Sequence, residues 1–182
     1  MVAAAMIDLV YAHPYPRRSR ANSVLLAAAA ELPFVQVRSL YERYPDFAID
    51  VESEQAALLE CKAVVWQHPL YWYSVPPLLK LWFDKVLALG FAYGEGGDKL
   101  RGKYCQWAIT TGGDHAAYGP DGIHSHLFPT FIPPIAQTAR FCGMHFPPPF
   151  IVHGAQRLSD EMLAGAAARY RERLIELEKS DG

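Results

Sequence analysis

Residues 104–113 read YCQWAITTGG. The apolar start predicts a buried strand, which Thr110 and the residues after it end with two hydroxyl groups and two glycines. Glycine lets the backbone approach a flat ligand closely. In an open α/β sheet, ligands bind beyond the carboxyl ends of strands, so N–H groups of this stretch are expected to face a ligand. A glycine-rich turn that binds nothing is the alternative interpretation.

Tyr118 and His124 follow in the same loop, and each side chain offers a hydrogen-bond donor. Both donors follow closely after the stretch that is expected to face a ligand. The alternative is that they are loop residues without a chemical role.

Length and composition favour one globular domain, expected to span residues 1–182. A hydrophobic fraction of 51% argues against disorder, and a net charge of −2 argues against a nucleic-acid partner. No apolar run is long enough to span a bilayer, and residues 1–6 make a poor signal peptide, so we expect a cytoplasmic protein without membrane insertion. The cysteines, Cys61, Cys105 and Cys142, are odd in number and are expected to be reduced and buried.

Apolar periodicity and turn signals predict strands and helices in alternation. Strands are expected at residues 6–12, 34–40, 63–68 and 104–109, with a fifth at either 144–146 or 150–152. Helices are expected at residues 24–30, 51–60 (capped by Asp50), 78–89, 131–142 and 160–179 (capped by Ser159), and residues 41–50 are expected to form a loop. This alternation predicts an α/β protein with a flavodoxin-like five-stranded parallel sheet, strand order 2-1-3-4-5 and helices on both faces.

Residues 13–22 follow the first expected strand and read HPYPRRSRAN. Ser19 and Asn22 stand at the start of a helix, with Arg17, Arg18 and Arg20 close by. Free N–H groups, the helix dipole and basic side chains together favour binding of an anion. An ordinary helix cap with solvated arginines explains the same residues equally well.

Residues 69–77 read PLYWYSVPP and follow the third expected strand. Three consecutive aromatic residues at a strand end suit a wall against a planar ligand, and a buried loop that fills the core is the alternative. The helix after them has apolar residues too widely spread for one stripe, so we expect it to contact a second subunit. The stretches after strands one, three and four should converge on one crevice.

Other chemistries lack support in the sequence. His115, His124 and His126 have no acidic or thiol ligand at metal-binding spacing, so we expect no metal site. His68, His145 and His153 are interpreted as structural histidines. No Gly-x-Ser-x-Gly or phosphate-loop motif is present.

Taken together, these motifs resemble the NAD(P)H:quinone oxidoreductase family of flavodoxin-like flavoproteins. The similarity covers roughly residues 6–152, and several segments lie in the order that this family has. They are AHP at 12–14, Ser19-x-x-Asn22, PLYWYSVP at 69–76, WFDKV at 82–86, FAY at 91–93, TTGG at 110–113 and Tyr118 to His124. The chain looks most similar to the small bacterial branch, which includes ancillary flavoproteins of glutathione-regulated potassium efflux systems.

The resemblance implies an FMN-dependent enzyme that passes hydride from NADH or NADPH to the flavin and then to a quinone; FAD is the alternative cofactor. It implies that the phosphate and ribityl end contacts His13, Ser19, Arg20, Ala21 and Asn22. It implies that the isoalloxazine lies against Pro69, Leu70, Tyr71, Trp72, Thr110, Thr111, Gly112 and Gly113.

Catalytic residues and partners are also implied by the resemblance. The hydride-transfer pair falls on Tyr118 and His124, and Tyr93 is expected to enter the quinone pocket of the other subunit of a homodimer. Glu95 replaces an aromatic residue of the family, which puts the shape of that pocket in doubt. A regulatory subunit of a potassium-efflux antiporter and a flavodoxin-type electron carrier are the alternatives, although carriers are usually strongly acidic.

Overall fold

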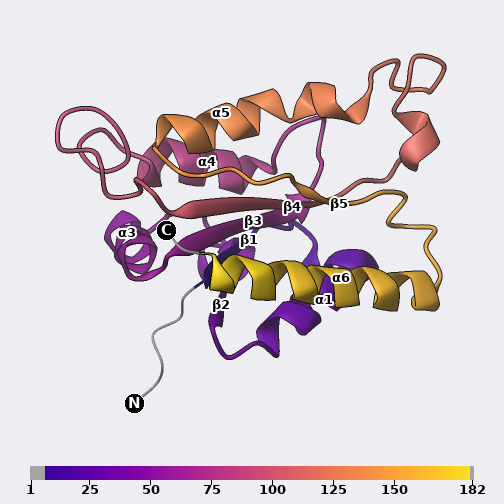
Figure 1. Ribbon diagram of the computed structural model, residues 1–182, viewed down its shortest axis with the longest axis horizontal. Coiled ribbons are helices and arrows are strands. Elements are labelled where there is room, and N and C mark those ends of the chain that lie inside the picture. The colour runs from indigo at the N-terminus through magenta and orange to yellow at the C-terminus, as the bar shows by residue number, and fades with distance from the viewer. Residues whose placement is uncertain (1–6, 181–182) are drawn as a thin grey trace.

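A five-stranded parallel sheet forms the centre of the molecule (Figure 1). The computed structural model describes residues 7–180, so Met6 of the first expected strand lies outside the described residues. The strands are β1 (Ile7–Tyr11), β2 (Val35–Ser39), β3 (Ala63–Pro69), β4 (Tyr104–Thr110) and β5 (Phe150–Val152). Their order is β2-β1-β3-β4-β5, which confirms the predicted topology.

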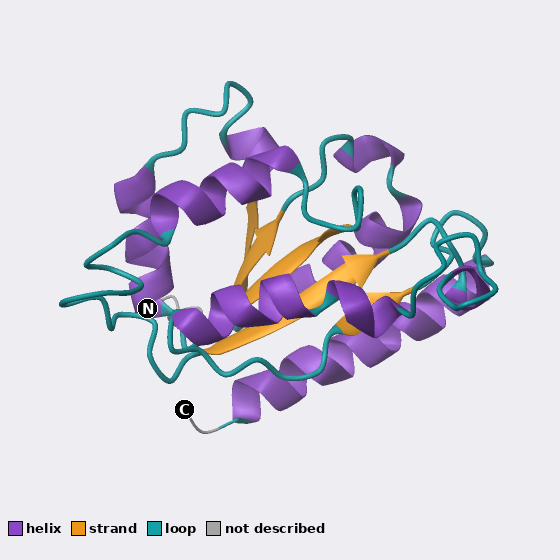
Figure 2. Cartoon of the chain, turned by 90° about the horizontal axis from the view of Figure 1, so that it is seen from above, coloured by secondary structure: helices purple, strands orange, loops and turns teal. Residues whose placement is uncertain are grey.

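Helices cover both faces of this sheet. They are α1 (Arg20–Ala30), α2 (Leu40–Arg43), α3 (Val51–Glu60), α4 (Pro77–Val86), α5 (Pro133–Phe141) and α6 (Asp160–Lys179), with 3-10 turns at Pro16–Arg18, His115–Ala117 and Phe128–Phe131. Figure 1 shows α4 and α5 above the sheet and α1 and α6 below it, and Figure 2 shows from above how helices lie across the strands. The prediction of a loop at residues 41–50 is wrong for its first residues, which belong to α2.

Side-chain caps start three of the helices where the sequence places polar residues. The caps are Ser19 Oγ, which accepts from Asn22 N at 3.3 Å, Asp50 Oδ1, which accepts from Ser53 N at 3.0 Å, and Ser159 Oγ, which accepts from Met162 N at 3.2 Å. Each cap satisfies one of the free N–H groups of a first helical turn. The predicted starts of α3 and α6 are therefore confirmed.

Two buried cores pack against the two faces of the sheet. Trp66, Trp82 and Trp107 lie in one core, and Tyr11 and Tyr170 lie in the other. Neighbouring residues of a strand point to opposite faces, so each central strand supplies both cores. This is why the central strands are apolar on both sides.

Helix α4 buries a single stripe within the chain. Its buried residues are Leu78, Leu79, Trp82, Phe83 and Val86. The helix ends at Val86, three residues earlier than expected, and Leu81 lies beside the buried stripe and is partly exposed. Contact of α4 with a second subunit stays a prediction.

The strand register brings four carboxyl ends to one edge of the sheet. Tyr11 of β1 is paired with Gln67 of β3, and Thr110 of β4 is paired with both Pro69 of β3 and Val152 of β5. The segments that leave these strands therefore start side by side. This edge is where the sequence predicts a ligand.

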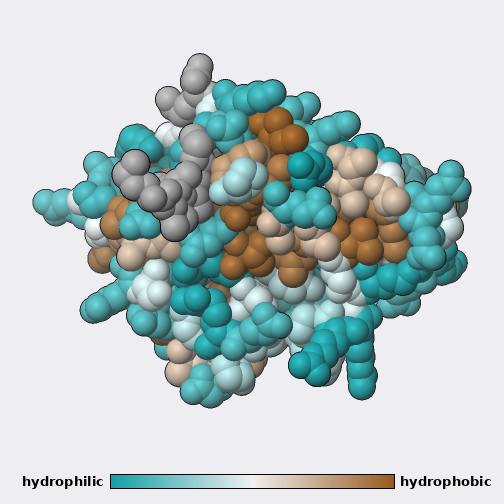
Figure 3. Space-filling view, turned by 90° about the horizontal axis from the view of Figure 1, so that it is seen from below, coloured by the Kyte–Doolittle hydropathy of each residue, from teal (hydrophilic) through white to brown (hydrophobic). Residues whose placement is uncertain are grey.

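The described surface is mixed in polarity. Figure 3 shows apolar residues gathered in a band across the face seen from below, bordered by hydrophilic residues. Among residues 7–180, no helix combines the length and the hydropathy needed to cross a membrane. Cys61, Cys105 and Cys142 are buried, and none of them forms a disulfide, as predicted.

Candidate functional site

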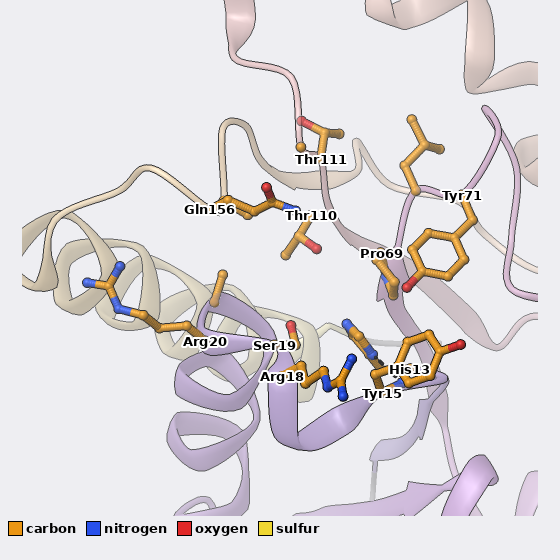
Figure 4. A pocket seen from close by; sticks show the side chains of 14 residues that line it. His13, Tyr15, Arg18, Ser19, Arg20, Pro69, Tyr71, Thr110, Thr111 and Gln156 are labelled. Atoms are coloured by element: carbon orange, nitrogen blue, oxygen red, sulfur yellow. Dashed lines mark hydrogen bonds between the residues drawn. The ribbon is translucent and has the colours of Figure 1, made fainter.

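A cavity of about 490 Å³ lies at the carboxyl edge of the sheet (Figure 4). Segments that follow β1, β3, β4 and β5 all contribute to its wall. The lining residues are His13, Tyr15, Arg18, Ser19, Arg20, Ala21, Pro69, Leu70, Tyr71, Thr110, Thr111, Gly112, Ala155 and Gln156. Ten of the thirteen predicted cofactor-binding residues are in this wall, and Asn22, Trp72 and Gly113 are not.

The first segment gives the cavity a basic, donor-rich end. Ser19 caps α1, so the free N–H groups of the first helical turn lie beside its side chain. The guanidinium of Arg18 lies over the ring of Tyr15 at 5.7 Å, and both residues line the cavity. Arg20 binds Asp160 at 2.5 Å and the carbonyl of Leu158 at 2.7 Å, which ties this end to the start of α6. The dipole and the two arginines together favour an anion here.

His13 presents a defined hydrogen-bonding pattern to the cavity. Its Nδ1 accepts from the backbone N–H of Tyr15 at 2.9 Å, so a neutral ring carries its proton on Nε2. Burial lowers the pKa of His13, which favours this neutral form. His13 is therefore suited to donate from Nε2 to an oxygen acceptor.

Asn22 lies beneath the wall of the cavity. It is buried, and its amide Nδ2 donates to Ser19 Oγ at 3.0 Å and to Thr110 Oγ1 at 2.8 Å. The amide thus joins α1 to the end of β4 through the two hydroxyls that do line the cavity. Any effect of Asn22 on a ligand must pass through Ser19 and Thr110.

The segment after β3 forms a tight turn. Tyr71 and Ser74 exchange two backbone hydrogen bonds, of 3.1 and 2.9 Å, around Trp72 and Tyr73. Both central residues have positive φ, 47° and 61°, in a turn type that usually carries Asn-Gly. Trp72 is 92% exposed. The predicted aromatic wall is therefore made by Pro69, Leu70 and Tyr71 in this structure, while Trp72 projects into solvent.

The loop after β5 holds the loop after β4. The backbone N–H of Ala155 donates to the carbonyl of Thr111 at 2.9 Å, and that of Gly154 donates to the carbonyl of Gly113 at 2.8 Å. The hydroxyl of Thr111 donates to the carbonyl of Gly113 at 2.7 Å and lies 3.0 Å from Nδ1 of His153. These bonds fix residues 110–113 relative to the cavity.

Tyr118 and His124 form a stacked pair beside Gly113. Their rings are 4.4 Å apart at an interplanar angle of 27°. A Cβ atom at Gly113 would lie 2.9 Å from Nε2 of His124, so glycine permits the close approach. The hydroxyl of Tyr73 lies 3.2 Å from Nδ1 of His124, and Nε2 is buried without a partner among the described residues. The pair borders the last residue of the predicted TTGG segment and lies outside the wall of the cavity.

Burial raises the pKa of Tyr118, and a hydrogen bond with Thr111 opposes that shift. Tyr118 is therefore neutral near pH 7 and keeps its O–H as a donor. Together, Tyr118 and His124 place a phenol hydroxyl and an imidazole ring next to a glycine-rich backbone.

Tyr93 lies apart from this pair within the chain. Its ring is 5.3 Å from Phe141, and both residues line a separate cavity of about 370 Å³ with Phe83 and Leu87. A role for Tyr93 at the site of Tyr118 therefore requires a second subunit, as the resemblance implies.

Sequence reasoning missed several residues of the wall. Tyr15 lies inside the HPYPRRSRAN segment and is not assigned to the ligand from the sequence, whereas Arg18 is one of the arginines expected beside an anion. Ala155 and Gln156 follow β5, and the rule that ligands bind at strand carboxyl ends would have indicated them. Among residues 7–180, no three His, Cys, Asp or Glu side chains gather in a way that could hold a metal ion.

A protein-family model described as flavodoxin-like fold matches residues 7–174. The chain belongs to the flavodoxin-like fold family. This flavodoxin-like chain is 50% identical over 175 residues to the glutathione-regulated potassium-efflux system ancillary protein KefF of Klebsiella aerogenes, covering 96% of this chain and 98% of that protein. The predicted resemblance to the small bacterial branch is confirmed.

Solved structures of similar flavodoxin-like chains come from several organisms. A thermophilic tryptophan halogenase from Streptomycin violaceusniger is 37% identical with a TM-score of 0.89, covering 96% of this chain and 99% of that chain. General stress protein 14 of Treponema denticola, in complex with FMN, is 33% identical with a TM-score of 0.88, covering 94% and 98%. An NADPH-quinone reductase from P.pentosaceus is 27% identical with a TM-score of 0.83, covering 92% and 96%. These descriptions differ in activity, so the comparisons show the family and its fold.

Proposed function

We propose that this protein is an FMN-dependent NAD(P)H:quinone oxidoreductase that works by two-electron, ping-pong hydride transfer. One observation carries the proposal: four chain segments build one cavity with a basic, donor-rich end and a flat end made of Pro69, Tyr71 and the backbone of residues 110–112. A flavin mononucleotide has the matching halves, a phosphate and a planar ring. The FMN complex of a 33% identical neighbour supports the same ligand class.

The residues of the basic end would hold the phosphate and the ribityl chain. The N–H groups at the start of α1, the hydroxyl of Ser19 and the guanidinium of Arg18 are donors to phosphate oxygens. His13 donates from Nε2 to a ribityl or phosphate oxygen, because its Nδ1 is already occupied by Tyr15. Arg20 contributes positive charge while it stays paired with Asp160.

The other half of the cavity would orient the ring. Pro69, Leu70 and Tyr71 offer one apolar side, and Gly112 offers a backbone N–H, whereas the N–H of Thr111 donates to the carbonyl of Val152. When bound, FMN supplies the hydride acceptor and donor chemistry of the reaction. Donors beside the ring stabilise the negative charge that the reduced flavin carries.

Tyr118 and His124 are proposed as the catalytic pair. The Nε2 atom of His124 is buried beside Gly113 and has no partner among residues 7–180, so its hydrogen-bonding capacity is unused within the described chain. The hydroxyl of Tyr73 lies 3.2 Å from Nδ1 of His124 and helps to orient the ring, since it can donate to or accept from that nitrogen. We infer that Tyr93 of the partner subunit completes the quinone pocket in a homodimer.

The absorbance spectrum of the purified protein tests the cofactor. A yellow protein that releases FMN, identified by mass, and that oxidises NADH or NADPH only when a quinone is added agrees with the proposal. A colourless protein that takes up neither FMN nor FAD contradicts it. Release of FAD in place of FMN would correct the cofactor and leave the reaction class in place.

A second function is favoured by the 50% identity with a potassium-efflux ancillary protein over 98% of its length. We infer that the chain docks on the cytoplasmic part of a potassium-efflux antiporter, which is compatible with enzyme activity. Co-purification of a tagged chain with such an antiporter tests it. Full antiporter activity in cells that lack this chain contradicts the regulatory role. An electron carrier, by contrast, would hold a long-lived one-electron state on redox titration.

A further inference from the structure

Three buried polar side chains form a hydrogen-bonded chain behind the cavity. The hydroxyl of Tyr170 on α6 donates to Oε1 of Gln67 on β3 at 3.0 Å. Nε2 of Gln67 then donates to the carbonyl oxygen and to Oδ1 of Asn22 on α1, at 3.3 and 3.4 Å. All three residues are at most 1% exposed. No part of the proposed reaction uses Tyr170 or Gln67 directly.

The bonds in this chain all run in one direction. The Tyr170 O–H occupies the oxygen of the Gln67 amide, so that amide turns its NH₂ group toward Asn22. The oxygen of the Asn22 amide is then an acceptor for Gln67, and its NH₂ group must point the other way. Both hydrogens of that group go to hydroxyl oxygens, those of Ser19 at 3.0 Å and Thr110 at 2.8 Å.

Both hydroxyls keep a hydrogen to donate, and Thr110 Oγ1 also keeps one acceptor position. Ser19 Oγ accepts from both the backbone N–H and the amide of Asn22, and Thr110 Oγ1 accepts from the amide. Among residues 7–180, neither hydroxyl donates to a protein acceptor. Both residues line the cavity, and Figure 4 shows their side chains near each other in its wall, so their hydrogens are available to a ligand oxygen.

We propose that Tyr170 and Gln67 are positioning residues that set the hydrogen-bond polarity of the cavity. They hold the amide of Asn22 so that Ser19 and Thr110 act as donors, which suits the acceptor oxygens of a phosphate and a ribityl chain. If the amide of Asn22 were free to turn over, its oxygen would accept from these hydroxyls and withdraw them from the ligand. The inference rests on the proposed binding of FMN and adds α6 to the residues that control it.

Flavin titrations of the apoprotein test the inference. Tyr170→Phe removes one hydroxyl and keeps the ring, and Gln67→Leu removes the middle of the chain. Tyr11→Phe is the matched control, because Tyr11 packs in the same core as Tyr170 and its buried hydroxyl has no partner among the described residues. Dissociation constants for FMN and for riboflavin, which lacks the phosphate, are measured by quenching of flavin fluorescence.

We expect Tyr170→Phe and Gln67→Leu to weaken FMN binding about tenfold, the size of one or two lost polar contacts. Tyr11→Phe should change it less than about twofold. Riboflavin should lose less affinity than FMN, so the preference for FMN over riboflavin falls. The double variant should be no worse than Gln67→Leu, because both changes break the same chain.

Other results of the titrations would overturn either the inference or the proposed function. Equal FMN affinity in Tyr170→Phe and Tyr11→Phe overturns the inference, and so does an equal loss for FMN and riboflavin, which indicates a packing defect. If Tyr170→Phe does not fold, the inference is tested with Gln67→Leu, by comparing its loss of affinity for FMN with its loss of affinity for riboflavin. A wild-type protein that binds no FMN overturns the proposed function itself, which separates the two failures.

Discussion

At the scale of single residues, His124 is the side chain whose change should separate binding from turnover. We expect His124→Gln to retain FMN, because His124 does not line the cavity, and to lose turnover with quinone by about ten- to a thousandfold, the range of a lost catalytic donor. Flavin content and steady-state NAD(P)H oxidation are the measurements. His126→Gln, an exposed neighbour, is the control and should remain close to wild type. Unchanged rates in His124→Gln would remove this residue from the mechanism.

Two adjacent glycines make a second test at this scale. A Cβ atom at Gly113 would lie 2.9 Å from His124 Nε2 and 3.0 Å from Ala117 Cβ, whereas one at Gly112 meets nothing within 4 Å. We expect Gly113→Ala to destabilise the apoprotein by about 1–3 kcal/mol, because the side chains it meets must shift, while Gly112→Ala leaves the melting temperature unchanged or slightly raised. Thermal unfolding of the flavin-free proteins measures both. Similar melting temperatures would show that the pair of Tyr118 and His124 is free to move.

At the scale of elements, a buried ion cluster joins β1, β2 and α3. Asp8 and Glu54 share the buried guanidinium of Arg38, and Glu54 also accepts from Trp82 Nε1 at 2.8 Å and from the hydroxyl of Tyr44 at 2.5 Å. These hydrogen bonds outweigh burial and lower the pKa of Glu54. Asp8 makes no hydrogen bond through its carboxylate among the described residues, and burial raises its pKa to about 7. Arg43 also lies 3.6 Å from Glu54, but its side chain is partly exposed, and burial still disfavours the ionised carboxylate of Asp8.

This cluster predicts a pH-dependent stability. Since the pKa of Asp8 is raised from 3.8 to about 7 in the folded state, its stabilising contribution is present below about pH 4 and is lost as the pH rises through about 7. As the pH rises from 5 to 8, we expect the free energy of unfolding of Asp8→Asn to increase by about 2 kcal/mol relative to that of the wild type. Urea unfolding at the two pH values measures the gain, with the exposed Asp121→Asn as control. A constant difference at both pH values would show that Asp8 is ionised throughout.

The turn after β3 carries a further element-scale prediction. Trp72 and Tyr73 adopt left-handed backbone angles that cost about 1 kcal/mol for residues with a Cβ, and Trp72 is too exposed to recover this by packing. We expect Trp72→Asn to stabilise the apoprotein by about 0.5–1 kcal/mol. We also expect it to weaken FMN binding, because the resemblance places Trp72 against the isoalloxazine ring. Melting temperature and FMN affinity are the readouts. Ile123→Asn, which changes another exposed apolar residue outside such a turn, should give no gain in stability. A Trp72→Asn protein with unchanged FMN affinity would remove Trp72 from the flavin site.

The elements also show what could be read from the sequence. Apolar strands and polar caps such as Asp50 and Ser159 follow local rules, so the sheet order and the starts of α3 and α6 were predictable. Four residues are too few to show a helical period, so α2 was missed. Whether Asn22 lines the cavity or lies beneath it depends on tertiary packing, and the exposure of Trp72 depends on the handedness of its turn. Ala155 and Gln156 have no distinctive chemistry, and only the strand-end rule points to them.

At the scale of the whole molecule, the position of Tyr93 predicts a homodimer. Tyr93, in the loop after α4, lies beside Phe141, the last residue of α5. Phe141 is 64% exposed, and neither residue lines the proposed FMN cavity. If two chains pair through this side, each subunit supplies its Tyr93 to the quinone pocket of the other, while FMN is held by a single chain. On this proposal, the cofactor site is separate from the part of the substrate site that depends on the dimer.

Phe141→Glu tests this separation, because a charge at an apolar contact is unfavourable when buried. We expect the variant to sediment as a monomer, to keep its FMN content, and to raise the KM for quinone by about tenfold or more, as when one good contact is lost. Met162→Glu, a similar change at an exposed residue of α6 on the opposite face, should remain dimeric with an unchanged KM. A wild-type protein that sediments as a monomer at all concentrations and still reduces quinone would refute the dimer. A monomeric Phe141→Glu protein with wild-type KM would instead show that the quinone pocket is complete within one chain, and Tyr93 would have no part in it.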